Sequence, residues 1–157
     1  MHKLGQRFLH AGIWLGIGLL LYLFFLRREA PPAQLIGADS VELRRAQDGH
    51  FHIDGTMQGA PVNFLIDTGA STVSISRQLA QRIGLGCDVS ATFSTANGVV
   101  RGCSSRIAEL EFGPFRIANV SVAILPNLTS EALLGMNALH KVRMEQQADR
   151  LRLSLPD

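Results

Sequence analysis

The chain has 157 residues and a net charge of +2, so it has room for one compact domain and an appendage. So small a charge gives no basic field and argues against nucleic acid as a partner. The two cysteines form no C-x-x-C pair, and the five histidines match no zinc spacing with them. His50 and His52 are therefore interpreted as solvated strand residues, and no metal or cofactor is expected.

The first predicted element is an apolar segment over residues 8–26, FLHAGIWLGIGLLLYLFFL. A helix of this length just spans a hydrocarbon core of about 30 Å. A cleaved signal peptide is the competing interpretation, but its apolar region usually covers about 7–15 residues and ends in a small-x-small site. Because this run is longer and ends in Arg27 and Arg28, we predict an uncleaved transmembrane signal anchor after a short flank, 1–7.

Basic residues lie on both sides of the predicted anchor. Lys3 and Arg7 precede it, and Arg27 and Arg28 follow it. The positive-inside rule therefore does not decide the orientation, although a membrane is the expected partner of residues 8–26.

Residues 27–48 contain two adjacent prolines, scattered charge and weak periodicity, and are predicted to be a tether without packed elements. The folded domain is expected over 49–157, where the apolar period is mostly two, as in strands. Strands are predicted near 51–57, 62–66, 72–76, 89–95, 99–107, 108–112, 115–125 and 151–155.

Turn and helix signals separate these strands. Asn97-Gly98 is a strong hairpin signal, and further turns are expected at Gly113-Pro114 and Asp149-Arg150. One short helix is predicted over 77–83, with Ser76 as its N-cap and Gly84 as its stop, and the segment 133–140 is predicted to be helical after its Gly135. Many short strands with about two short helices indicate an all-β barrel or closed sandwich.

The stretch FLIDTGASTVSIS, residues 64–76, places Asp67 at the end of an apolar run. Aspartate is a poor strand residue and is rarely buried unpaired. From the residue types alone two interpretations stay open: Asp67 caps a turn, or its loop holds the carboxylate toward a cleft. A phosphate-binding loop of the actin-like ATPase kind is excluded by size, because about 110 folded residues cannot hold two lobes.

FLIDTGAST resembles the active-site loop of aspartic peptidases, specifically of the single-domain retropepsin-like group. STANG at 94–98 falls where that family has its flap hairpin, and ALLGMNAL at 132–139 resembles its apolar-apolar-Gly segment and following helix. The likeness extends over residues 50–155 and is greatest to membrane-anchored bacterial members.

The resemblance implies a small closed barrel of the retropepsin, or half-pepsin, type with one or two short helices after a single transmembrane helix. It implies an aspartic endopeptidase in which two aspartates hold and activate one water. Since the chain has a single D-T-G, it implies a homodimer with Asp67 from each copy, desolvated and paired, acting on a protein or peptide substrate.

Further residues take their expected roles from the same resemblance. Thr68 would form a hydrogen bond across the dimer, and the backbone of Gly69 would be free to hydrogen-bond the substrate. The flap would close over the bound peptide. Ser71 and Met136 stand where retroviral members often have an acidic residue and an arginine, so an ion pair that braces the viral dimer is missing. The expected site residues are Asp67 (catalytic), Thr68, Gly69 and Ala70 (active-site loop), Thr95, Ala96, Asn97 and Gly98 (flap), and Leu134 and Gly135 (support).

Cys87 and Cys103 lie on the two arms that lead to the predicted flap hairpin. A disulfide and two small buried thiols both fit this position. The family resemblance favours the bacterial inner membrane, with the catalytic domain in the periplasm. The alternative function is a catalytically silent dimerisation or peptide-binding module of the same fold, against which the intact D-T-G argues.

Overall fold

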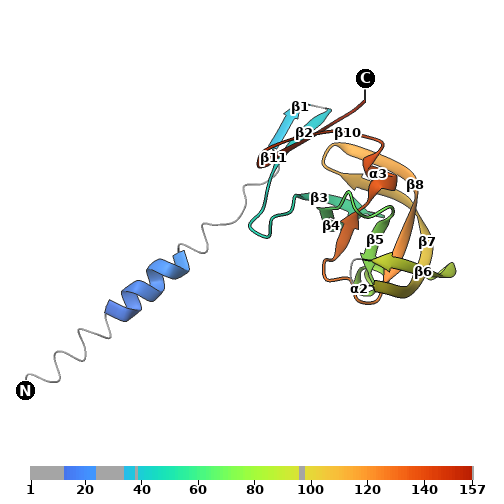
Figure 1. Cartoon of the computed structure of the whole chain (residues 1–157), viewed down its shortest axis with the longest axis horizontal. Helices are drawn as coiled ribbons and strands as arrows, with labels where there is room; N and C mark the ends of the chain where they lie inside the picture. The colour runs from blue at the N-terminus through green and yellow to red at the C-terminus, as the bar shows by residue number, and fades with distance from the viewer. Residues whose placement is uncertain (1–12, 24–33, 38, 96–97, 157) are drawn as a thin grey trace, which may run out of the picture. The chain divides into compact units, whose positions relative to one another are not determined.

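The computed structural model describes residues 13–23, 34–37, 39–95 and 98–156. The chain divides into two units, Met1–Pro31 and Pro32–Asp157. In the first unit, residues 13–23 form a helix (Figure 1). Among the helices that the structure describes, none has the length and apolar character needed to cross a membrane. The ends of the predicted anchor, 8–12 and 24–26, lie outside the described residues.

The second unit is built around a barrel (Figure 1). Its strands are hydrogen-bonded in the order β3-β4-β9-β5-β8-β7, and β7 pairs again with β3 to close the cylinder. Strand β6 continues the sheet beyond β7. The prediction of a small, closed, all-β barrel is therefore confirmed. The strands are β3 (His52–Met57), β4 (Ala60–Ile66), β5 (Val73–Ser76), β6 (Val89–Thr95), β7 (Gly98–Phe112), β8 (Phe115–Leu125) and β9 (Ala132–Leu134).

Alternation along these strands places one apolar set inside the barrel, as the period of two predicts. In β4, Val62, Phe64 and Ile66 are buried while the residues between them are more exposed. The barrel closes where Gly55 pairs with Phe112. A Cβ at Gly55 would lie 2.0 Å from the Glu111 carbonyl oxygen, so only glycine allows this approach.

A separate sheet has the strand order β1-β2-β11-β10, from β1 (Gln34–Gly37), β2 (Ser40–Arg44), β11 (Arg150–Ser154) and β10 (Arg143–Gln147). Val41 and Leu43 of β2 are buried with Leu151 and Leu153 of β11. This differs from the tether predicted over 27–48, because β1 and β2 lie within that range. The alternation of apolar and polar residues in β2 is too short to predict a strand by itself, and its partner β11 comes from the far end of the chain.

The helices follow their predicted start signals. Helix α2 (Arg77–Arg82) is capped by Ser76, whose Oγ accepts a hydrogen bond of 3.1 Å from the Leu79 N–H. Helix α3 (Met136–Leu139) begins after Gly135. The predicted start after Gly135 is confirmed, and residues 133 and 134 before it belong to β9, which lies between β4 and β5.

The strand β7 is continuous, although the sequence predicted a break near residue 107. The turn predicted at Gly113 is confirmed by the pairing of Phe112 with Phe115. The hairpin predicted at residues 97–98 is confirmed in its register, since Thr95 pairs with Gly98, while the turn residues 96–97 lie outside the described part.

Replacement of Leu43 by alanine tests whether β2 belongs to the folded domain. Leu43 is 1% exposed, so Leu43→Ala should lower the free energy of unfolding by about 2–5 kcal/mol, through lost burial and a cavity. Urea unfolding of the full chain in detergent micelles measures this. Leu155→Ala is the control, since Leu155 is 50% exposed and should change little. Equal stability of both variants would contradict a packed β2.

Candidate active site

Asp67 is the first residue after β4. Its backbone N–H donates a 3.1 Å hydrogen bond to the Leu134 carbonyl, which extends the pairing of β4 with β9 by one residue. The parallel register of Ile66 with Leu134 therefore fixes where the chain leaves the sheet. Asp67 is half-buried, and Thr68 and Gly69 are exposed, so the loop turns outward at Asp67.

The loop hydrogen-bonds its own carboxylate. The Gly69 N–H donates to Asp67 Oδ1 at 2.8 Å, and the Ala70 N–H donates to the Asp67 carbonyl at 3.3 Å. A Cβ at Gly69 would lie 3.1 Å from Oδ1 and would crowd that oxygen. One carboxylate oxygen is thus held by the backbone, and within the described residues no partner is bonded to Oδ2.

Leu134 and Gly135 lie directly against the loop. A Cβ at Gly135 would lie 2.5 Å from the carbonyl carbon and oxygen of Thr72 and 2.9 Å from the Ala70 carbonyl oxygen. All of these are backbone atoms, which cannot move aside as a flexible side chain can. Glycine is therefore required for the loop to pass over the end of β9.

Asn137 is a site residue that the sequence interpretation missed. Its Oδ1 accepts a 2.8 Å hydrogen bond from the Val73 N–H, and its Nδ2 donates at 2.8 Å to the Ser121 carbonyl. Its backbone N–H donates to the Ser71 carbonyl at 3.1 Å. Asn137 thus ties the end of the Asp67 loop to β5 and β8. An asparagine just after L-L-G-M, where α3 begins, was the available signal.

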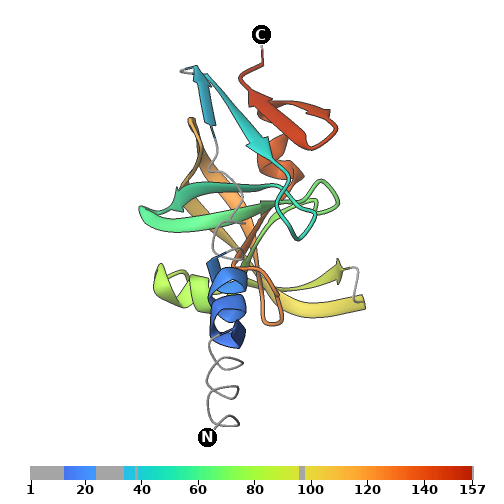
Figure 2. The same ribbon diagram turned by 90° about the vertical axis from the view of Figure 1, so that its left-hand side faces the viewer.

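The predicted flap corresponds to the hairpin of β6 and β7, whose arms project sideways from the barrel (Figure 2). Near its tip, Thr95 Oγ1 donates to the Gly98 carbonyl at 2.8 Å. Ala96 and Asn97, the other predicted flap residues, lie outside the described residues.

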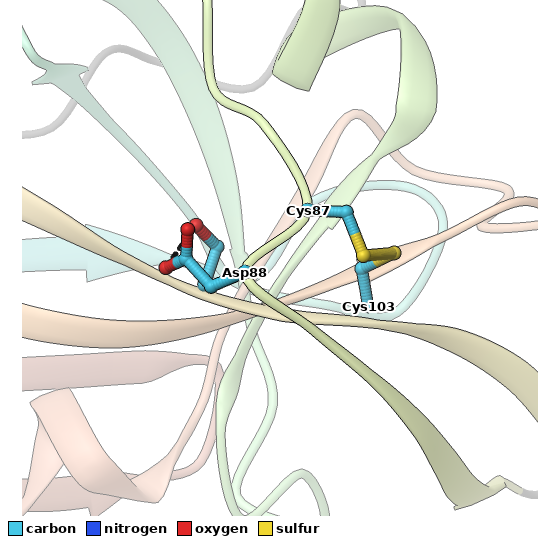
Figure 3. The surroundings of a disulfide bond; sticks show 4 residues. Cys87, Asp88 and Cys103 are labelled. Carbon is cyan, nitrogen blue, oxygen red and sulfur yellow. Dashed lines mark hydrogen bonds between the residues drawn. A yellow bond between two sulfur atoms is a disulfide. The ribbon is translucent and has the colours of Figure 1, made fainter.

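A disulfide joins Cys87 to Cys103, with their Cα atoms 5.3 Å apart. Figure 3 shows Asp88 pointing away from this bond, and its Oδ2 accepts a 2.9 Å hydrogen bond from Ser105 Oγ. Cys87 precedes β6, and Cys103 lies where β7 pairs with both β6 and β8. The two contacts therefore fasten the entry arm of the hairpin to β7. Of the two interpretations left open for the cysteines, the structure has the disulfide.

No group of three metal-ligating side chains occurs in the described part of the chain. His52 is instead in a surface network, with Nε2 2.7 Å from Asp48 Oδ2 and Nδ1 3.1 Å from Asn63 Oδ1. The backbone N–H of His50, and then His52 itself, lower the pKa of Asp48.

Two curated bacterial proteins are similar in sequence. The chain is 27% identical to the "Uncharacterized protein in cobV 5'region" of a Sinorhizobium species, over 97% of this chain and 75% of that protein. It is 26% identical to "Uncharacterized protein RP867" of Rickettsia prowazekii (strain Madrid E), over 64% of this chain and 45% of that protein.

A solved structure shares the fold. The crystal structure of a retropepsin-like aspartic protease from Rickettsia conorii superposes with a TM-score of 0.66 at 26% identity. The match covers 74% of this chain and 90% of the other.

The sequence model of one protein family, described as "gag-polyprotein putative aspartyl protease", matches residues 53–141. This range includes the Asp67 loop, the flap hairpin and Gly135, together with Asn137. It is more than half of the chain, and the chain therefore belongs to the gag-type aspartyl protease family, with a retropepsin-like fold.

Proposed function

We propose that the protein is an aspartic endopeptidase that hydrolyses peptide bonds with a water held between two Asp67 residues of a homodimer. The observation that carries this proposal is the geometry of the Asp67 loop. The Gly69 N–H holds Oδ1, while Oδ2 is left without a partner among the described residues. A carboxylate fixed in this way has one oxygen in place to bind and deprotonate a water.

A second copy is needed because the chain has a single D-T-G. The loop lies on the surface of the chain, with Thr68, Gly69 and Ser71 exposed, which leaves it accessible to a partner. A twofold axis through the site would bring the two Asp67 carboxylates together, and such a pair shares one proton. Thr68 and Gly69 would contact the partner loop and the substrate backbone.

The reaction then balances in two steps. The ionised Asp67 takes a proton from the water as its oxygen attacks the peptide carbonyl carbon, and the protonated Asp67 gives its proton to the carbonyl oxygen. The tetrahedral intermediate collapses with cleavage of the C–N bond. The first Asp67 protonates the leaving amine, and the other recovers its proton, which leaves a carboxylic acid and an amine. Closure of the β6–β7 hairpin would exclude other water.

For the location, we propose an anchor over residues 8–26 in the bacterial inner membrane and a catalytic domain in the periplasm. The Cys87–Cys103 disulfide supports this proposal, because disulfides persist in oxidising compartments. Confinement to a membrane would also raise the effective concentration of a weak dimer.

Asp67→Asn tests the catalytic role. The amide cannot act as general base, so cleavage of a mixed peptide library by the full chain in detergent should fall by at least about 10³-fold, while the melting temperature stays close to that of the wild type. Asp149→Asn is the matched control, an exposed aspartate in the turn between β10 and β11. Normal turnover by folded Asp67→Asn protein would contradict the proposed mechanism. Wild-type protein without inhibitor-sensitive cleavage would favour the silent module.

The shared site is tested by dilution and by mixing. Specific activity should fall as the enzyme is diluted, because the dimer dissociates by mass action. Excess Asp67→Asn protein should also inhibit the wild type, since mixed dimers lack one carboxylate. Activity that stays constant on dilution, with a monomer in sedimentation, would show that one copy suffices. Asp149→Asn protein, added in the same excess, should not inhibit.

The location is tested in intact cells and spheroplasts. Membrane-impermeant alkylating reagent is added before lysis, and thiols are then counted in the denatured protein. A periplasmic domain should show no free thiol and should be degraded when protease is added to spheroplasts. Two free thiols together with a protected domain would place the domain in the cytoplasm.

A further inference from the structure

The outer edge of the β6–β7 hairpin is open. Strand β6 ends the barrel sheet and pairs only with β7 among the described strands. Its sequence, VSATFST, contains no proline and no charged residue. Natural sheets usually protect an edge with such residues, since free backbone N–H and C=O groups accept a further strand.

The two faces of the hairpin differ in polarity. In the register, Ser90 pairs with Cys103 and Thr92 with Arg101, so their side chains share one face. Ser90, Thr92 and Arg101 are exposed, whereas Phe93, on the other face, is half-buried. This face, which we call the polar face, also carries the exposed Val99 opposite Ser94, and it lies toward solvent.

A hollow of about 490 Å³ opens beside this polar face. Its volume lies within the usual range for ligand sites, about 300–1,000 Å³. Its lining combines two arginines with hydroxyl and apolar groups from the hairpin, α2 and β8: Arg77, Ser90, Ala91, Thr92, Arg101, Gly102, Cys103 and Ile124.

The two arginines of the hollow are not neutralised. Neither Arg77 nor Arg101 forms an ion pair or a side-chain hydrogen bond with another described residue. Nearby carboxylates are engaged elsewhere: Glu131 pairs with Arg82 at 2.5 Å, and Asp88 accepts from Ser105 and points away from Cys103 (Figure 3). Two guanidinium groups at one hollow without an acid favour an anionic ligand, because each binds a carboxylate through paired N–H donors.

We propose that the hollow and the free edge of β6 bind an extended acidic peptide segment. The peptide backbone pairs with β6 as an added strand, and its glutamate or aspartate side chains reach Arg77 and Arg101. The hydroxyls of Ser90 and Thr92 bond to the remaining polar groups. An inorganic anion would use the arginines but not the strand edge, so the open edge favours a peptide. This binding does not require catalysis by Asp67.

The test is fluorescence anisotropy with full-length Asp67→Asn protein in detergent micelles, which prevents cleavage. The probe is a labelled peptide of alternating glutamate and threonine, and its comparator has glutamine for glutamate. The glutamate peptide should bind at least about tenfold more tightly, and R77Q with R101Q should remove that preference. The control R106Q should preserve it, because Arg106 is exposed on the same strand but does not line the hollow.

Two further measurements separate the peptide from a simple anion. The backbone N–H groups of an extended peptide point alternately to its two sides, and only one alternate set faces β6. N-methylation of that set should abolish binding, and N-methylation of the other set should not. Phosphate at the ionic strength of the buffer should not compete. Equal binding of both peptides, loss of binding in R106Q, or full competition by phosphate would each overturn the proposal.

Discussion

The approach of Gly135 to the loop that follows Asp67 is the contact on which the site depends. Strands β4 and β5 are joined by that loop but are not neighbours, because β9 lies between them. The loop must therefore pass over the end of β9, where Thr72 and Ala70 leave no room for a Cβ. The topology itself turns the loop outward and exposes the residues that follow Asp67. Asn137 then fixes the far end of the loop to β5 and β8.

The disulfide has the corresponding role for the flap hairpin. Strand β6 has a single partner strand among those described, so its own pairing gives it little support. The Cys87–Cys103 bond attaches the segment before β6 to the point where β7 enters the barrel. The part of the hairpin beyond the bond has only the pairing of β6 with β7. If the hairpin acts as the proposed flap, a base fixed in this way would let its tip close over a peptide without disturbing the barrel.

The barrel could be predicted from local sequence, because the alternation of apolar and polar residues along single strands such as β4 shows which residues face the core. The Asp67 loop was expected only from the resemblance of its D-T-G-A-S stretch to a known family, since the residue types alone left two interpretations open. The Ser76 cap was equally local. The sheet of β1, β2, β10 and β11 could not be predicted in this way. Its β10, RMEQQ, is largely exposed and has no apolar pattern, and β2 pairs with a strand from the other end of the chain. Asn137 was missed because its importance comes from two backbone partners distant in sequence.

The half-buried state of Asp67 in the single chain connects the fold to the proposed chemistry. A carboxylate that keeps access to water carries little desolvation cost, so the isolated chain needs no second charge to fold. In the proposed dimer the Asp67 carboxylate would lose contact with bulk water and would share a proton with the carboxylate of the second copy. Both changes would prepare it for proton transfer. The cost of desolvation would then fall on association rather than on folding. In the proposed dimer, catalytic competence and assembly would thus be one event.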